Sequence, residues 1–207
     1  MYKALVPVKA LNEAKSRLAP SLTQEQRKTL VLDMLHHVIA TLLASEALEG
    51  VTVVSPDPLV LEKARIWGAY AQIEEVHGHN PALSVAAERE LATGATALLT
   101  ISADLPLLHP YDVQGMVELS RLYDVVLAPS WEGTGTNALL VRPPLALPYL
   151  FGPGSLQHYL KEIHKKHLAS MLYNSIGMAL DVDTIDDIDM FQCYEAEGKA
   201  MYASCYV

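Results

Sequence analysis

A carboxylate follows the most apolar strand-like run of this chain. Residues 97–101 read Ala-Leu-Leu-Thr-Ile, and Asp104 and Pro106 come shortly after them. Such a run is typical of a strand buried on both faces of a parallel sheet, and proline cannot donate a hydrogen bond to a neighbouring strand. Because open α/β sheets bind ligands beyond the carboxyl ends of their strands, Asp104 is a candidate ligand-binding residue. A turn or capping aspartate is the alternative.

Groups that bind phosphate gather in the loop after the first apolar run. Lys9, Lys15, Ser16 and Arg17 can donate hydrogen bonds to phosphate oxygens, arginine as a bidentate fork and lysine as a point charge. These three basic residues lie within one short loop of a chain that has 24 acidic and 15 basic residues. The loop has no glycine, so it is neither a Walker loop nor a dinucleotide fingerprint. It is either a site for an anionic substrate or a solvated surface loop.

Two later stretches carry groups of the same kind. Residues 151–155 read Phe-Gly-Pro-Gly-Ser before an expected helix at 156–167, and free N–H groups at a helix start, with a serine hydroxyl, can bind an anion. Further on, Asp181 and Asp183 share one face of an expected strand by the two-residue period. The first stretch could also be a plain turn, and Asp183 or Thr184 could instead cap the last helix.

The elements that would position these residues alternate between strand and helix in the first half of the chain. A capping box over residues 21–24 is expected to begin the first helix. Expected strands cover 2–8, 51–54, 70–74 and 97–101, expected helices cover 23–44, 59–67 and 82–92, and 77–81 is an expected loop. The connections are long enough for crossovers, so this half predicts a mainly parallel sheet with helices on both faces.

The second half is more mixed. Expected helices cover 110–121, 156–167 and 185–197, expected strands cover 124–128, 138–141, 171–174 and 178–182, and 130–137 is an expected loop that contains glycine. The last residues, 201–207, are apolar for a chain end, and we expect them to form a strand on the sheet or on a second subunit.

Composition limits the class of protein. The chain has 207 residues, 51% of them hydrophobic and 19% charged, which fits one domain over 1–207. No apolar run approaches the roughly 18–20 residues needed to span a bilayer, and residues 1–8 make a poor signal peptide, so a cytoplasmic protein without membrane contact is expected. A net charge of −9 argues against nucleic acid as a partner.

Cysteine and histidine usage gives no sign of a metal centre built on these residues. Cys193 and Cys205 lack a paired-ligand spacing, so neither a disulfide framework nor a zinc site is expected. His36 and His37 fall in the helix expected at 23–44, where a surface or interface role is more common than metal binding.

The candidate groups together predict a nucleoside triphosphate site. A basic loop after the first strand and carboxylates after two later strands are what a triphosphate with Mg²⁺ requires, because Mg²⁺ takes one or two carboxylates together with phosphate oxygens. The basic loop would neutralise charge on a departing pyrophosphate. No serine, histidine and aspartate set suggests covalent catalysis, and an anionic phosphate nucleophile would need no general base.

Six short motifs occur in one order along nearly the whole chain, and together they resemble the 2-phospho-L-lactate guanylyltransferases of coenzyme F420 assembly. The resemblance also extends to the wider group of GT-A-like nucleotidyltransferases. It implies a Rossmann-like, three-layer α/β nucleotidyltransferase fold with a mostly parallel mixed sheet and one antiparallel element. The motifs are Pro7-Val-Lys9, Ala14-Lys-Ser-Arg-Leu18, Ser102-Ala-Asp-Leu-Pro106, Gly135-Thr-Asn-Ala138, Phe151-Gly-x-Gly-Ser155 and Asp181-Val-Asp-Thr184.

The resemblance also implies a reaction and roles for individual residues. GTP and 2-phospho-L-lactate would give lactyl-2-diphospho-5′-guanosine and pyrophosphate, with Mg²⁺ as cofactor. By the family's pattern, the triphosphate would be bound by Lys9, Lys15, Ser16 and Arg17, with Asn80 and Ser84 near the nucleotide. The metal would be bound by Asp104 with Asp183 or Asp181, and Asp183 is preferred. The acceptor would be bound by Thr136, Gly152 and Ser155. Lys9, Lys15, Arg17 and Asp104 would be the catalytic residues.

Other functions stay open on the sequence. The same chemistry could serve phosphoenolpyruvate, 3-phosphoglycerate or a molybdopterin phosphate, and no residue of the chain decides among these acceptors. A catalytically silent nucleotide-binding domain would keep the sheet and the basic loop but would not need Asp104, Asp181 and Asp183 together. A structural protein assembled through residues 201–207 is a third reading, although the same tail could join two copies of an enzyme as a homodimer.

Overall fold

Seven strands form one mixed sheet in the computed structural model, which describes the backbone of residues 1–204 and the side chains up to Tyr194 together with that of Ala196. The order across the sheet is β3-β2-β1-β4-β6-β5-β7, and β6 runs antiparallel to both of its neighbours while the other pairs are parallel. The strands are β1 (Tyr2–Pro7), β2 (Gly50–Ser55), β3 (Tyr70–Ile73), β4 (Ala97–Ile101), β5 (Val125–Pro129), β6 (Thr136–Val141) and β7 (Ser170–Leu172).

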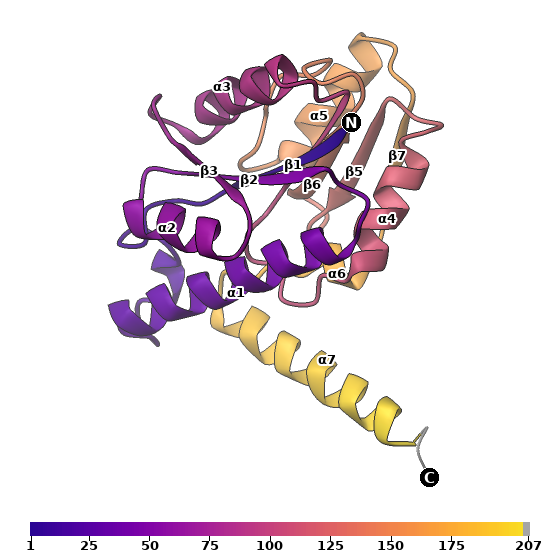
Figure 1. Cartoon of the computed structure of the whole chain (residues 1–207). Helices are drawn as coiled ribbons and strands as arrows, with labels where there is room; N and C mark the ends of the chain where they lie inside the picture. Colours follow the sequence, from indigo (N-terminus) through magenta and orange to yellow (C-terminus); the bar gives the residue numbers. More distant parts are fainter. Residues whose placement is uncertain (205–207) are drawn as a thin grey trace.

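Helices cover both faces of this sheet and make three layers (Figure 1). One face carries α1, α2, α4 and the short α6, and the other carries α3 and α5. The last helix, α7, leaves the body of the molecule. Their bounds are α1 (Gln24–Ala44), α2 (Pro58–Ile66), α3 (His79–Ala92), α4 (Pro110–Leu119), α5 (Ser155–Lys165), α6 (Ile176–Ala179) and α7 (Ile185–Ser204), and a 3₁₀ turn, η1, covers Ser16–Leu18.

Alternation along the strands builds the two cores. In β1, Ala4 and Val6 face the layer of α1 and α2, whereas Leu5 faces α3. All five residues of β4 are buried, as expected for a central strand covered on both faces. The predicted α/β class, the mostly parallel sheet and the single antiparallel strand are therefore confirmed, and so is the strand at 97–101.

Three local predictions are wrong. The capping box of α1 is formed by Thr23 and Gln26, not over residues 21–24, because both serine or threonine positions fit the same short pattern and only one begins the helix. Helix α3 begins at His79, so the expected loop at 77–81 is partly helical. Strand β6 begins at Thr136, inside the expected loop.

The end of the chain also differs from the expected strands. Residues 178–182 form no strand; α6 is a helical turn, and an irregular segment follows it. A short apolar run cannot be assigned to strand or helix by its period alone. Residues up to Ser204 belong to α7 rather than to a strand, and residues 205–207, which include Cys205, lie outside the described residues.

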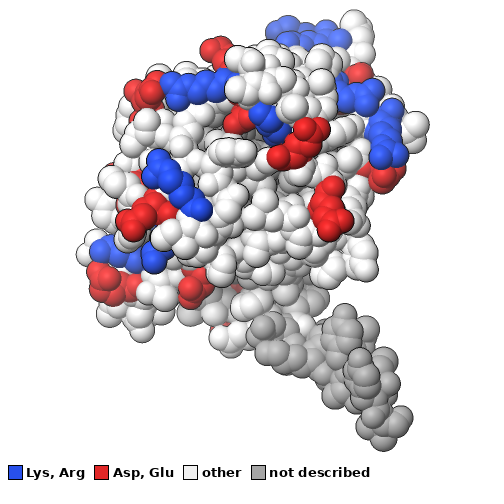
Figure 2. All heavy atoms as spheres, in the orientation of Figure 1, with Lys and Arg blue, Asp and Glu red and all other residues white. Residues whose placement is uncertain are grey.

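The surface charge and the helices relate to the two partners that the sequence argues against, nucleic acid and a membrane. Acidic and basic side chains are interspersed on the face shown in Figure 2, with broad uncharged areas between them. Among the described residues, none of the helices has the length and apolar character required to cross a membrane. His36 stacks on Trp67 at the surface of α1, with ring centroids 4.7 Å apart, which agrees with the surface role expected for it.

Candidate active site

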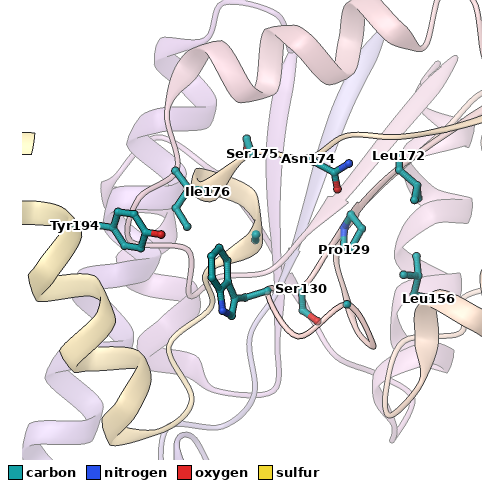
Figure 3. Close-up of a pocket in the computed structure, with 11 residues that line it drawn as sticks. Pro129, Ser130, Leu156, Leu172, Asn174, Ser175, Ile176 and Tyr194 are labelled. Carbon is teal, nitrogen blue, oxygen red and sulfur yellow. The ribbon is translucent and has the colours of Figure 1, made fainter. Parts of the chain in front are cut away.

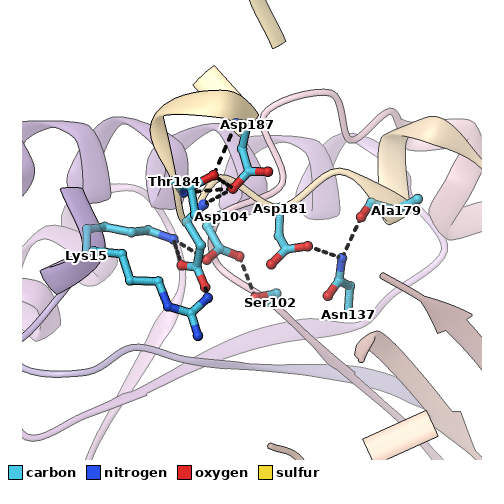
Figure 4. A network of polar contacts seen from close by, with 10 residues as sticks. Lys15, Ser102, Asp104, Asn137, Ala179, Asp181, Thr184 and Asp187 are labelled. Atoms are coloured by element: carbon cyan, nitrogen blue, oxygen red, sulfur yellow. Dashed lines mark hydrogen bonds and ion pairs between the residues drawn. The ribbon is translucent and has the colours of Figure 1, made fainter. Parts of the chain in front are cut away.

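Three segments far apart in the sequence meet at the carboxyl edge of the sheet (Figure 4). Lys15 comes from the loop after β1, Asp104 from the turn after β4, and Asp183 from the segment before α7. The Lys15 Nζ donates to Asp104 Oδ2 and, at 2.9 Å, to Asp183 Oδ1. Three of the residues predicted for the site are therefore in direct contact.

Lys15 is held in this place by an unusual backbone. Its φ of 52° and ψ of 41° lie in the left-handed region, which is costly for a residue other than glycine and recurs at functional sites. Only 7% of its side chain is exposed. Burial alone would lower the pKa of Lys15, but the carboxylates of Asp104 and Asp183 raise it above its ordinary value. Lys15 is thus a fixed ammonium ion among carboxylates.

Asp104 has the contacts of a site residue. Its carboxylate accepts from Ser102 Oγ at 2.5 Å as well as from Lys15, and 20% of the side chain is exposed. Its backbone carbonyl accepts from Val182 N at 3.2 Å, which ties the turn after β4 to the segment before α7. Both partners of this carboxylate are side-chain groups and neither is a backbone N–H at a helix start, so capping is not its role.

The loop that carries Asp183 is fixed by the cap of α7. Thr184 N and Thr184 Oγ1 donate to Asp187 Oδ2 at 2.7 and 2.8 Å, and Asp183 N donates to the same oxygen at 2.9 Å. Thr184 and Asp187 therefore do the capping, which leaves the Asp183 carboxylate free for Lys15. Burial would raise the pKa of Asp183, but the charges of Lys15, Arg17 and Lys9 lower it below its ordinary value.

Asp181 is the third carboxylate of the cluster, and it depends on Asn137. The Asn137 Nδ2 donates to Asp181 Oδ1 at 2.9 Å and to the carbonyls of Ala179 and Met178 at 2.9 and 3.1 Å. Burial, followed by the negative charge of Asp104, raises the pKa of Asp181 to about 6. Asn137 lies in one of the motifs but was not predicted to have a role; a buried asparagine in a strand is the signal that could have found it.

The composition of this cluster fits a divalent cation. Asp104, Asp181 and Asp183 offer only carboxylate oxygens, the ligands that Mg²⁺ prefers. The ammonium of Lys15 already occupies a cation position between Asp104 and Asp183, and burial, followed by the negative charge of Asp104, raises the pKa of Asp181. In the structure as it stands, the described residues contain no group of three or more acidic, histidine or cysteine side chains arranged to hold a metal ion.

The predicted acceptor residues lie beside this cluster. An antiparallel strand begins where its parallel neighbours end, so Thr136, the first residue of β6, lies at the same edge as Asp104; the backbone contact from Ser102 N to Asn137 O, 2.8 Å, fixes this register. Ser155 begins α5, and Leu156 N donates to Thr134 O at 3.2 Å. Thr136, Gly152 and Ser155 are thereby brought to one region.

One unpaired polar atom and one open position mark this region. The Oγ1 of Thr136 is buried and has no hydrogen-bond partner among the described residues, and an unpaired buried hydroxyl is costly. Gly152 has a φ of +128°, and nothing lies within 4 Å of the place where a Cβ would stand. Gly154, in the left-handed region, precedes α5, where the N–H groups of Ser155 and Leu156 already donate to Gly152 O and Thr134 O. The positive end of the helix dipole still favours an anion at this end of α5.

The remaining basic-loop residues are more exposed. The Arg17 side chain is 73% exposed, and its Nη1 lies 3.7 Å from Asp183 Oδ2. Lys9 and Ser16 are exposed, and the charge of Lys9 helps to lower the pKa of both Asp183 and His79. These side chains surround the cluster from the solvent side.

The structure places Asn80 and Ser84 differently from the other nucleotide residues. The Asn80 amide is hydrogen-bonded to the backbone of Phe151, and Ser84 Oγ donates to the carbonyl of Asn80 at 3.1 Å within α3. These hydrogen bonds do not connect either side chain to Lys15, Asp104 or Asp183. Nucleotide contact by either residue stays a prediction.

A hollow of about 540 Å³ opens on the other side of the acceptor region. Figure 3 shows Tyr194 of α7 and Ile176 of α6 on one side, with Leu156 and Leu172 on the opposite side. Its lining is mostly apolar and includes Trp131, which is 54% exposed. The sequence did not predict this hollow, because its walls come from four separate stretches of the chain: 129–133, 156, 172–179 and 194.

Comparison with known families and proteins finds guanylyltransferases. A family model described as guanylyl transferase, CofC-like, matches residues 2–202. A phosphoenolpyruvate guanylyltransferase of Rubrobacter xylanophilus is 42% identical over 200 residues, which cover 96% of each chain. A 2-phospho-L-lactate guanylyltransferase of a Methanocaldococcus species is 32% identical over 189 residues, covering 90% of this chain and 79% of the relative.

Solved structures share the fold at low sequence identity. A nucleotidyl transferase from Methanothermobacter thermautotroptrophicus superposes with a TM-score of 0.67 at 13% identity, covering 96% of this chain and 99% of the other. A glucosyl-3-phosphoglycerate synthase from Mycobacterium tuberculosis, solved with Mg²⁺ and uridine diphosphate, has a TM-score of 0.60 at 13% identity and covers 83% and 68%. At these identities the likeness concerns the fold alone.

Proposed function

The chain belongs to the CofC-like family of guanylyltransferases, and from that premise we propose that it transfers GMP from GTP to the phosphate of a small three-carbon acid. An oxygen of the acceptor phosphate attacks the α-phosphorus of GTP, the bond between that phosphorus and the bridging oxygen to the β-phosphorus breaks, and pyrophosphate leaves. The products are a guanosine diphosphate diester of the acid and pyrophosphate. The acceptor oxygen is already anionic at neutral pH, so no general base is required.

The observation that carries this proposal is the contact of Lys15 with both Asp104 and Asp183. A cation from the basic loop and carboxylates from two later segments share one point at the carboxyl edge, where nucleotides bind in open α/β sheets. A silent binding domain would gain nothing from grouping three partly buried carboxylates, because such grouping costs free energy unless a cation compensates it. The cluster therefore supports an enzyme.

The basic loop would bind the triphosphate. Lys9, Ser16 and Arg17 reach solvent around the cluster, where an incoming phosphate could replace water. Lys15 would neutralise charge as pyrophosphate leaves, which is the electrostatic contribution that phosphoryl transfer requires. Catalysis would then depend on positioning and charge rather than on proton transfer.

A divalent cation would be held by Asp104 and Asp183, with Asp181 as a further ligand. When bound, Mg²⁺ would neutralise phosphate charge during the transfer. Asp104→Asn removes one carboxylate charge with little change of shape, so we expect pyrophosphate release to fall at least about a hundredfold while the melting temperature stays close to that of the wild type. A variant that keeps near-wild-type release would contradict the assignment of Asp104 as a metal ligand.

Thr136, Gly152 and Ser155 would bind the acceptor. The unpaired Thr136 hydroxyl and the positive end of the α5 dipole suit a phosphate or carboxylate. The relative with 42% identity is named for phosphoenolpyruvate, so we propose phosphoenolpyruvate as the preferred acceptor. The second candidate is 2-phospho-L-lactate, the acceptor expected from the sequence, and a relative with 32% identity bears that name.

Pyrophosphate release tests both the reaction and the acceptor. The full chain would be incubated with GTP and Mg²⁺ and with phosphoenolpyruvate, 2-phospho-L-lactate, 3-phosphoglycerate or no acceptor. We expect release with one of the first two acceptors and a higher kcat/KM for phosphoenolpyruvate. Binding of GTP without release in any arm would favour a silent nucleotide-binding domain, and a higher kcat/KM for 2-phospho-L-lactate would reverse the order of the two acceptors. Both acids and GTP are intracellular phosphates, which suits the cytoplasmic location expected from the sequence.

A further inference from the structure

One side chain joins the first turn of α3 to the loop that precedes α5. The Asn80 Nδ2 donates to the carbonyl of Phe151 at 2.9 Å, and the N–H of Phe151 donates to Asn80 Oδ1 at 2.9 Å. The amide thus pairs with both backbone groups of one residue, 71 positions away. Paired hydrogen bonds of this kind fix orientation as well as distance.

The side chain of Phe151 strengthens the same attachment. Its ring meets His79 edge to face, with centroids 5.8 Å apart, stacks on Tyr149 at 6.0 Å and meets Tyr159 edge to face at 5.5 Å. Aromatic pairs at such distances are favourable beyond the area they bury. Tyr149 is in turn hydrogen-bonded to Thr100 of β4 at 2.9 Å. Phe151 is therefore fixed from α3, α5 and the sheet together.

Gly152 and Pro153, which follow Phe151, are exposed, whereas Ser155 is buried and its N–H donates to Gly152 O at 3.1 Å. Gly152 has a positive φ and open space around it, and Gly154 is in the left-handed region. Glycine loses more conformational freedom on ordering than any other residue. The shape of the loop from Gly152 to Ser155 consequently depends on how its first anchor is fixed, and that anchor is Phe151.

We propose that Asn80 is a positioning residue for the acceptor: by fixing Phe151 it holds the loop of Gly152 and Ser155 in the conformation that binds the phosphorylated acid. The inference rests on the proposed function of that loop. It departs from the nucleotide contact that the sequence suggested for Asn80, because both polar groups of the amide are already paired with Phe151. Asn80 therefore sets the affinity for the acceptor and leaves the affinity for GTP unchanged.

Steady-state kinetics of Asn80→Ala distinguish positioning of the acceptor loop from contact with the nucleotide. Losing both hydrogen bonds of the amide is expected to raise the KM for the acceptor about tenfold or more, with the KM for GTP within about twofold of the wild type. Glu88→Gln, an exposed position on the same helix, is the matched control and should change neither constant. A raised KM for GTP with an unchanged KM for the acceptor would overturn the proposal.

Two measurements without turnover keep the test independent of the proposed reaction. Hydrogen exchange of the Phe151 amide should be faster in Asn80→Ala than in the wild type, and calorimetric binding of phosphoenolpyruvate without nucleotide should weaken about tenfold. Asn80→Asp, which retains an acceptor for the Phe151 N–H but no donor, serves if the alanine variant does not fold. Unchanged exchange and unchanged binding would overturn the positioning role, whereas an inactive wild type with faster exchange in the variant would overturn only the proposed function.

Discussion

Lys15 shows how one residue can act in the same site both without and with a bound divalent cation. The side chain is almost fully buried between Asp104, which is 20% exposed, and Asp183, which is 44% exposed. In this arrangement its ammonium compensates carboxylates that would otherwise repel each other and Asp181. A divalent cation bound by the same carboxylates would compete with Lys15 for them, and Lys15 would then be available to a phosphate oxygen.

Lys15→Met tests this competition. Without the ammonium, the carboxylates are left uncompensated, so the free energy of unfolding in the absence of Mg²⁺ should fall by about 1–3 kcal/mol, less than the roughly 3–5 kcal/mol of a fully buried pair because Asp183 is partly exposed. Added Mg²⁺ should then raise the melting temperature of the variant more than that of the wild type. Thermal unfolding with and without Mg²⁺ measures both effects.

A surface lysine provides the control for that variant. Lys28→Met breaks only an exposed ion pair with Glu25 within α1, so its stability should change little and its response to Mg²⁺ should match the wild type. An equal response to Mg²⁺ in Lys15→Met and the wild type would contradict competition for the carboxylates.

At the scale of elements, the sequence predicted the strands better than the contacts between them. Residues 97–101 form β4 as expected because a continuous apolar run of that length suits a strand buried on both faces. The expected strand at 178–182 failed because such short runs carry no decisive period. The site residues were named from motifs, but the pairing of Lys15 with Asp104 across 89 positions depends on the sheet order, which local patterns do not contain.

The short helix α6 packs too closely on α4 to tolerate a larger residue. A Cβ added to Gly177 would lie 2.7 Å from the carbonyl oxygen of Leu107 and would collide with the Asp112 carboxylate. Asp112 also accepts from His109 N at 2.9 Å as part of the α4 cap. Gly177→Ala should therefore lower the free energy of unfolding by about 1–3 kcal/mol, measured by urea denaturation.

The exposed neighbour Asn174 gives the comparison for this variant. Asn174 is exposed and lies two residues before α6. The free energy of unfolding of Asn174→Ala should therefore stay within about 0.5 kcal/mol of the wild type. If Gly177→Ala were as stable as Asn174→Ala, the close approach of α6 to α4 would be wrong.

Helix α1 contributes a pH dependence through His37. Its Nε2 lies 3.1 Å from the carbonyl oxygen of Leu108, and burial, together with the nearby His109 and His36, lowers its pKa below the ordinary value despite that hydrogen bond. The folded protein thus binds the proton less readily than the unfolded chain, so stability is lost as pH falls through the unfolded pKa of about 6.5. His37→Gln cannot take up this proton.

The difference in melting temperature between His37→Gln and the wild type should therefore become more favourable to the variant between pH 7.5 and pH 5.5. Thermal unfolding at several pH values measures it. A difference that does not vary with pH would show that His37 titrates alike in the folded and unfolded states.

On the scale of the whole molecule, the candidate active site lies at a seam in the sheet. Strands β3, β2, β1 and β4 are parallel and bring the basic loop and Asp104 to their carboxyl edge. Strand β6 begins at that edge and runs in the opposite direction, so its first residue, Thr136, lies at the same edge. Its antiparallel direction therefore brings the residues proposed for the acceptor to the same edge as those proposed for the nucleotide.

Helix α7 has a separate role at each end, which leads to a prediction about assembly. Its first turn carries the Thr184 and Asp187 cap that fixes Asp183, whereas its far end leaves the body of the molecule. An isolated helix is marginal in water, and pairing with a second copy would stabilise it.

We therefore expect the full chain to be a homodimer that uses the residues after Ala200, as the apolar end of the sequence suggested. Light scattering should give twice the mass of one chain for the full protein and a single-chain mass for a variant ending at Ala200, with pyrophosphate release per chain within about twofold because the cap is untouched. An unchanged mass after truncation would argue against this end of the chain as the interface.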